Sequence, residues 1–136
     1  MLVVRRKLPA PREAVYAAWT DPQSIREWMC PGDVVSAEAK LDVRVGGSYR
    51  ILMKGKEDYD HTGTYQIVDP PSKLAFTWIS QGTNHQATLV TLEFLDHGKE
   101  SELVLTHERF ASEDMMKRHQ GGWTQIVEKL AVHFQK

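Results

Sequence analysis

The C-terminal segment constrains the fold most strongly, because its apolar residues recur at the spacing of one helical face. These residues are Trp123, Ile126, Val127, Leu130, Ala131 and Phe134. Most of the chain before this segment, from about residue 34 to residue 108, shows strand-like alternation and turns instead. A single long helix after an antiparallel sheet can bury its apolar face only across that sheet. We therefore predict a helix packed on a sheet, and a cavity between them if the sheet curves.

Seven segments are predicted to form the sheet, because apolar and polar residues alternate along them. They are residues 2–8, 34–41, 48–54, 62–68, 74–79, 87–95 and 102–108. Gly46 and Gly47 precede the third segment and are predicted to supply a positive φ or a close backbone approach at a bend. Short connections between successive strands favour antiparallel pairing throughout.

Two short helices are predicted between the first two strands. Pro11 suits the first turn of one helix, and Asp21 followed by Pro22 is typical of the start of another, which runs through Trp28. Near the C-terminus, Ser112 is a candidate N-cap. The Gly121–Gly122 pair is expected to interrupt or bend the helix that follows. The predicted class is α+β, with a curved seven-stranded antiparallel sheet around the C-terminal helix.

Composition narrows the class of partner. The 136 residues suit a single domain over residues 1–136, and 17 basic against 18 acidic side chains argue against nucleic acid. The one cysteine, Cys30, has no partner for an internal disulfide. No apolar run approaches the roughly 18 residues of a membrane span, and the N-terminus lacks the pattern of a secretory signal. We expect a cytoplasmic protein that is a monomer or a homodimer.

Seven segments in order carry a resemblance to a known family. They are Ala10–Pro22, Trp28, Asp42–Tyr49, Gly63–Tyr65, Pro70–Trp78, Leu103–His107 and Gly121–Trp123. In their order, and in the placement of their proline and glycine residues, these segments resemble the START-like (SRPBCC) superfamily. Within it they resemble the activator of heat shock protein 90 ATPase homologue group. The resemblance implies the helix-grip fold. It also implies functions that range from binding hydrophobic small molecules to cyclising polyketides or assisting a chaperone.

The leading functional hypothesis is non-enzymatic binding of a small hydrophobic molecule between the C-terminal helix and the sheet. Five aromatic residues are candidates for its lining, namely Tyr49, Tyr65, Phe76, Trp78 and Trp123. Aromatic side chains line apolar pockets, but they also fill cores, and the sequence leaves both interpretations open. One alternative is a chaperone-associated interaction module, and a less favoured one is an enzyme of the cyclase or dehydratase type.

Three polar residues are candidates for orienting such a ligand. His107 falls on the apolar face of its strand, and His119 lies four residues before Trp123 on one helical face. Arg44 could bind a carboxylate, although it could equally pair with Asp42 two residues away. The histidines show no spacing typical of metal ligands, and no catalytic set is recognisable. We therefore predict no metal, no cofactor and no catalytic residues.

Overall fold

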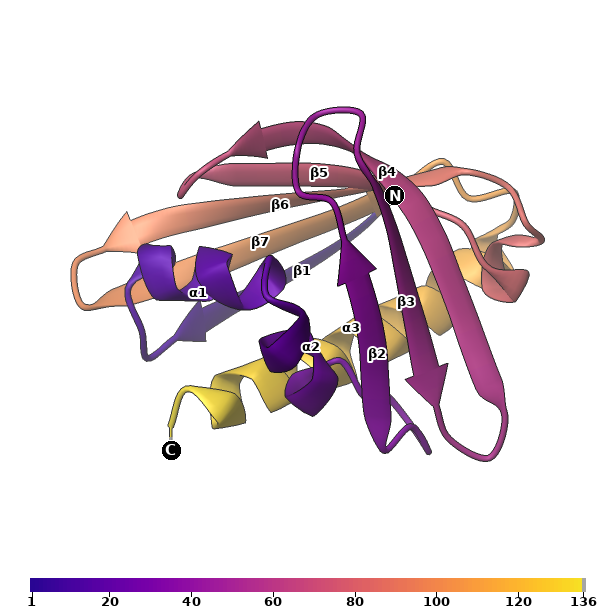
Figure 1. The fold of residues 1–136 in the computed structure, drawn as a ribbon, viewed down its shortest axis with the longest axis horizontal. Helices are drawn as coiled ribbons and strands as arrows, with labels where there is room; N and C mark the ends of the chain where they lie inside the picture. Colours follow the sequence, from indigo (N-terminus) through magenta and orange to yellow (C-terminus); the bar gives the residue numbers. More distant parts are fainter. Residues whose placement is uncertain (136) are drawn as a thin grey trace.

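The computed structural model describes residues 1–135, and Figure 1 shows how its elements are arranged. In chain order they are β1 (Leu2–Leu8), α1 (Arg12–Trp19), α2 (Pro22–Trp28), β2 (Ser36–Leu41), β3 (Ser48–Lys54), β4 (Asp58–Asp69), β5 (Lys73–Trp78), the 3-10 turn η1 (Gln81–Thr83), β6 (Thr88–His97), β7 (Glu100–Glu108) and α3 (Glu113–His133). The predicted α+β class, with two short helices after the first strand, is confirmed.

The strands form one antiparallel sheet in the order β1-β7-β6-β5-β4-β3-β2. Only β1 is out of sequence, because the two-helix connection carries the chain from it to the far edge of the sheet. The sheet curves so that α3 lies across its hollow side, with α2 beside that helix and α1 against β6 and β7 (Figure 1). This is the predicted helix-grip arrangement.

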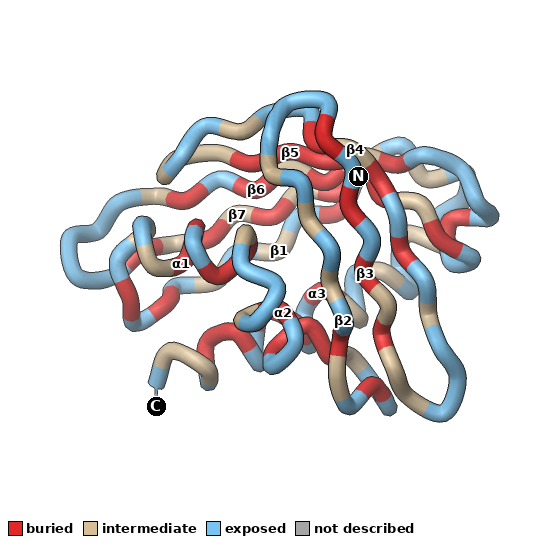
Figure 2. Tube along the Cα trace, viewed as in Figure 1, coloured by how far each residue is buried: buried red, intermediate tan, exposed pale blue. Residues whose placement is uncertain are grey.

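The core lies between α3 and the concave face of the sheet. On α3 the buried residues are Trp123, Ile126, Val127, Leu130 and Ala131, which matches the predicted apolar face, while Phe134 at the C-cap is half-buried. Along β6 and β7, buried residues alternate mainly with half-buried ones (Figure 2). The predicted interruption at Gly121–Gly122 is wrong, because α3 is continuous from Glu113 to His133.

Two features of β4 differ from the sequence prediction. The strand begins at Asp58 rather than at residue 62, because the β3–β4 hairpin extends to the pair Lys54–Asp58. Its alternation also breaks between Tyr65 and Ile67, where a bulge shifts the register. Tyr65 is therefore buried, whereas Ile67 is 38% exposed instead of sharing its face.

The glycine pair before β3 has the structural role that the sequence indicated. Gly46 has a φ of 82°, and its N–H donates to the carbonyl of Tyr65 (2.8 Å). The N–H of Tyr65 in turn donates to the carbonyl of Gly47 (2.9 Å). A Cβ at Gly47 would lie 2.0 Å from the carbonyl oxygen of Asp42, so only glycine fits this close approach.

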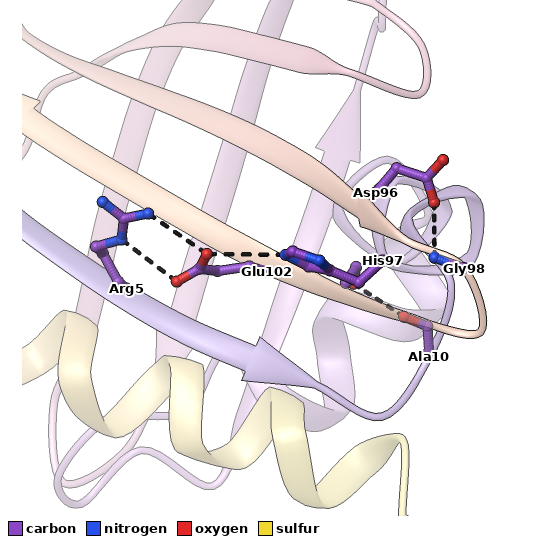
Figure 3. A network of polar contacts seen from close by, with 7 residues as sticks. Arg5, Ala10, Asp96, His97, Gly98 and Glu102 are labelled. Carbon is purple, nitrogen blue, oxygen red and sulfur yellow. Dashed lines mark hydrogen bonds and ion pairs between the residues drawn. The ribbon is translucent and has the colours of Figure 1, made fainter.

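A polar network ties the outermost strand to its neighbours. Glu102 on β7 accepts from Nε and Nη2 of Arg5 on β1 (3.3 and 3.4 Å), and His97 lies 3.9 Å from the same carboxylate (Figure 3). The buried Ser101 donates to the carbonyl of Ala10 (2.9 Å). These contacts hold the β1–α1 connection against the β6–β7 hairpin, at the end of the sheet away from η1.

Candidate functional site

A cavity of about 480 Å³ lies between the N-terminal half of α3 and the sheet. Its walls come from the α2–β2 loop, the β3–β4 hairpin, η1 with the turn after it, and α3. The lining residues are Pro31, Gly32, Asp33, Val34, Met53, Asp58, Tyr59, Asp60, His61, Ser80, Gln81, Gly82, His85, His119, Gly122 and Gln125. The volume falls within the range of roughly 300 to 1,000 Å³ that small-molecule sites occupy.

The η1 wall is built by local hydrogen bonds. Ser80 Oγ accepts from the N–H of Gly82 (3.1 Å), and Thr83 Oγ1 accepts from the N–H of Ser80 (3.1 Å). These reciprocal bonds form a capping box, and Asn84 ends the turn in the left-handed region with a φ of 54°. The turn places Gly82 against His119, because a Cβ at Gly82 would lie 3.1 Å from His119 Cε1.

The opposite wall is held by Asp33 in the α2–β2 loop. Its Oδ2 accepts from the N–H of Lys56 (2.7 Å), and its Oδ1 accepts from the hydroxyl of Tyr59 (3.3 Å). The bond from Lys56 lowers the pKa of the Asp33 carboxyl most strongly. This carboxylate therefore fixes the β3–β4 hairpin beside the loop that precedes β2.

His61 forms part of the floor of the cavity. It is 8% exposed, and its ring stacks on Trp78 with 4.5 Å between the ring centroids. Burial lowers the pKa of His61 to about 4, so the ring is neutral near pH 7. Its Nδ1 has no hydrogen-bond partner among residues 1–135.

His119 reaches the cavity from α3. Its Nδ1 lies 2.8 Å from the carbonyl of Met115, and burial lowers its pKa. A carbonyl oxygen can only accept, so Nδ1 carries the proton and Nε2 offers a lone pair. The ring also packs against Phe110 (5.0 Å between centroids) and edge-on to His107 (5.2 Å).

His107 is a core histidine whose two nitrogens are both satisfied. The indole N–H of Trp123 donates to Nδ1 (2.9 Å), which fixes the proton of the neutral ring on Nε2. Nε2 then donates to Thr88 Oγ1 (2.7 Å), whose hydroxyl donates to the carbonyl of Trp78 (2.6 Å). Burial, together with the nearby His119, lowers the pKa of His107 to about 3. This chain of bonds joins β5, β6 and β7 to α3.

The five candidate aromatic residues lie in the core beside the cavity and do not line it. Tyr49, Tyr65 and Phe76 surround a separate space of about 10 Å³, which is room for one water molecule at most. Trp123 and Trp78 pack on one another with 4.9 Å between centroids, and Trp19 covers Trp123. The middle of the helix–sheet interface is therefore filled with side chains, and the available volume lies toward the N-terminal half of α3.

Among the polar candidates, only His119 lines the cavity. His107 lies directly behind it. Arg44 is on the β2–β3 connection, where its exposed guanidinium donates to Asp42 (2.9 Å). The structure thus brings His107, His119, Trp78 and Trp123 together and leaves Arg44 at the surface.

Sequence reasoning did not single out Gly122, Gln125 or the η1 turn as parts of a site. Ser80 followed by Thr83 and Asn84 is a recognisable turn signal, but nothing in it indicates that the turn faces a helix 40 residues further along. Among residues 1–135, no group of three or more histidine, cysteine, aspartate or glutamate side chains could hold a metal ion. Over the same residues, no helix is both long and apolar enough to cross a bilayer.

The bent antiparallel sheet, the C-terminal helix across it and the cavity beside that helix define the START-like, helix-grip class. The model of the family described as Activator of Hsp90 ATPase homolog 1-like protein matches residues 9–135. The chain belongs to this family. At family level, its fold supports a ligand-binding or an Hsp90-associated role.

Solved structures show the same architecture. The AHSA1 protein from Silicibacter pomeroyi is 25% identical, with a TM-score of 0.82 over 97% of this chain and 95% of its own. CalU16 from Micromonospora echinospora is 26% identical, with a TM-score of 0.74 over 96% of this chain and 73% of its own. An HSP90 activator from Plasmodium falciparum is 20% identical, with a TM-score of 0.78 over 96% and 93%, which shows the fold alone. No curated protein matches the chain in sequence.

Proposed function

We propose that the protein binds a small, largely apolar organic molecule in the cavity beside α3, without transforming it. The observation that carries the proposal is a preformed space of about 480 Å³, whose buried floor combines Met53 and Val34 with His61 and Ser80. Apolar surface that the ligand buries there would contribute roughly 25 cal/mol per Å², less the costs of association. We place this activity in the cytoplasm, as the sequence predicted.

Gly122 supplies a second argument. Glycine in the interior of a helix destabilises it by about 1 kcal/mol relative to alanine, and nothing lies within 4 Å of a Cβ built at this position. No neighbouring protein atom therefore demands a glycine here. Since Gly122 lines the cavity, a ligand that approaches the helix backbone would account for it.

The test is a thermal-shift panel of lipids and aromatic metabolites on the wild type and two leucine variants. Gly122→Leu is expected to fold, to fill part of the cavity and to abolish the shift given by any ligand found. Gly121→Leu makes the same change at an exposed neighbour outside the lining and is expected to retain binding. Ligands that bind Gly122→Leu as tightly as the wild type would show that the cavity is not their site.

A chaperone-associated role is the second candidate, and the family match is the observation that favours it. It predicts that the protein forms a complex with Hsp90 and changes the rate of ATP hydrolysis by that chaperone. A coupled ATPase assay with increasing amounts of the protein measures this directly. An unchanged rate, together with no complex in sedimentation, would reject the role.

An enzymatic role is less well supported by the histidines. Acid–base catalysis commonly relies on two groups whose environments push their pKa values apart. His61 and His119 both have lowered pKa values, and burial is the largest cause for each. Near pH 7 they are two neutral rings, which suits hydrogen bonding to a ligand better than proton transfer.

A further inference from the structure

We propose that the cavity selects an uncharged molecule with an apolar body, a hydroxyl or N–H donor toward His119, and a carbonyl acceptor toward Gln125. This inference rests on the proposed function and adds the chemical class of the ligand. It follows from three positions on one side of α3, namely His119, Gly122 and Gln125, which all line the cavity.

His119 provides the acceptor. Because its Nδ1–H is used by the carbonyl of Met115, only the lone pair of Nε2 remains for a ligand. No group in residues 1–135 donates a hydrogen bond to that atom. A ligand hydroxyl or N–H would complete the ring's bonding, whereas an ether or a carbonyl at the same place would face the lone pair without a proton.

Gln125 provides the donor. Its Oε1 accepts from the N–H of Gly32 (2.6 Å), which fixes the orientation of the amide and leaves the NH₂ group for a ligand. The α-helical rise places residues 119 and 125 about 9 Å apart along the axis. Gly122 lies between them without a side chain, so a flat apolar body can rest on the helix there.

The charges around the cavity select against anions. Three carboxylates, those of Asp33, Asp58 and Asp60, lie in the lining, and no lysine or arginine of the described chain does. The Arg50 guanidinium pairs with Asp60 (2.9 Å) but does not line the cavity. Three histidines line the cavity. Burial lowers the pKa values of His61 and His119, which keeps them neutral, whereas His85 is exposed. A ligand carboxylate or phosphate would thus be desolvated beside three carboxylates, without a lysine or arginine to pair with.

The experiment uses four biphenyls that differ only in their end groups, with dissociation constants measured by calorimetry on the full chain at pH 7.5. 4-Acetyl-4′-hydroxybiphenyl presents both required groups and is expected to bind most tightly. Its methyl ether lacks the donor, and 4-hydroxybiphenyl lacks the acceptor. Each is expected to bind about tenfold more weakly, the effect of one hydrogen bond. 4′-Hydroxybiphenyl-4-carboxylate is expected to be the weakest of the four.

Two variants assign each group to its residue. His119→Phe retains a ring and is expected to remove the preference for the hydroxyl over the methyl ether. Gln125→Glu retains an acceptor for the N–H of Gly32 and is expected to remove the preference for the ketone. Gln120→Glu makes the same charge change on α3 outside the lining and is expected to leave both preferences intact.

The outcomes separate this inference from the proposed function. Tightest binding by the carboxylate, or equal binding by the hydroxyl and its methyl ether, would overturn the ligand class while the cavity remained a binding site. The ligand class would also be overturned if none of the biphenyls binds while a compound of the panel binds the wild type and not Gly122→Leu. If neither the biphenyls nor the panel bind, the proposed function itself is wrong.

Discussion

Lowering the pH from 7.5 to 5.0 is expected to destabilise the protein through two buried histidines. The pKa values of His107 and His61 are lowered to about 3 and about 4, against about 6.5 in an unfolded chain. Between those values and 6.5 the unfolded chain binds more protons than the folded one. The contribution of these two histidines to the unfolding free energy is therefore fully present above pH 6.5, and it is lost as the pH falls toward their folded-state pKa values.

The magnitude follows from the distance of pH 5.0 from the unfolded value. At 1.5 pH units below 6.5, and about 1.36 kcal/mol per unit, each neutral buried histidine costs about 2 kcal/mol of unfolding free energy. Together the two histidines account for a loss of about 4 kcal/mol. His107 has a specific reason to stay neutral, because a second ring proton on Nδ1 would face the indole N–H of Trp123.

His107→Gln isolates one of the two contributions. The glutamine amide offers one acceptor for Trp123 and one donor for Thr88, which reproduces the bonding of the neutral ring without a titrating group. We expect urea unfolding to show a loss between pH 7.5 and 5.0 that is about 2 kcal/mol smaller for the variant than for the wild type.

Comparing losses between two pH values cancels any packing cost of the substitution itself. Equal losses in the wild type and in His107→Gln would refute the assignment of His107 as a neutral core residue.

Three further changes test the packing. Gly121→Ala is expected to raise the unfolding free energy by about 1 kcal/mol in the same urea assay, because the position is exposed, helical and sterically open. Gly63→Ala should lower it by about 3 kcal/mol, since the new Cβ would lie 2.0 Å from the carbonyl oxygen of Thr77; a wild-type midpoint would contradict that contact. Leu130→Ala should cost about 2–5 kcal/mol, and a smaller loss would show that the helix–sheet core collapses around the cavity left behind.

Periodicity predicted the fold because each buried element has one apolar face, and that face fixes both its type and its orientation. The prediction was wrong where burial does not govern the sequence. Residues 58–61 of β4 lie in a hairpin that extends beside the cavity, so polar side chains occupy strand positions there. At the bulge after Tyr65, the backbone of Tyr65 bonds to Gly46 and Gly47, and no alternation pattern encodes these bonds.

The candidate site was less predictable, because a filled core and an open pocket use the same aromatic residues. Trp78 can either contact a ligand or pack on Trp123. Which of the two occurs depends on the summed volumes of the core side chains, not on the position of either tryptophan in its own element. The polar residues that line the cavity are also hard to predict from the sequence. The bond between Gly32 and Gln125 joins positions 93 residues apart, and neither residue belongs to a recognisable motif.

The two halves of α3 have different roles: the C-terminal half packs in the core, and the N-terminal half faces the cavity. From Trp123 onward its apolar face is covered by the sheet and by α2, and this half supplies the stability of the interface. Between His119 and Gly122 the helix instead presents the Nε2 lone pair of His119 and the bare backbone of Gly122 to the cavity. His107 packs behind the ring of His119. A ligand that spans His119 and Gln125 would join η1 and the α2–β2 loop through contacts absent without it. It would therefore stabilise the folded state in proportion to the logarithm of its concentration over its dissociation constant. Gly122→Leu should abolish that dependence on ligand concentration without weakening the helix–sheet interface, because Trp123 and the residues after it are unchanged.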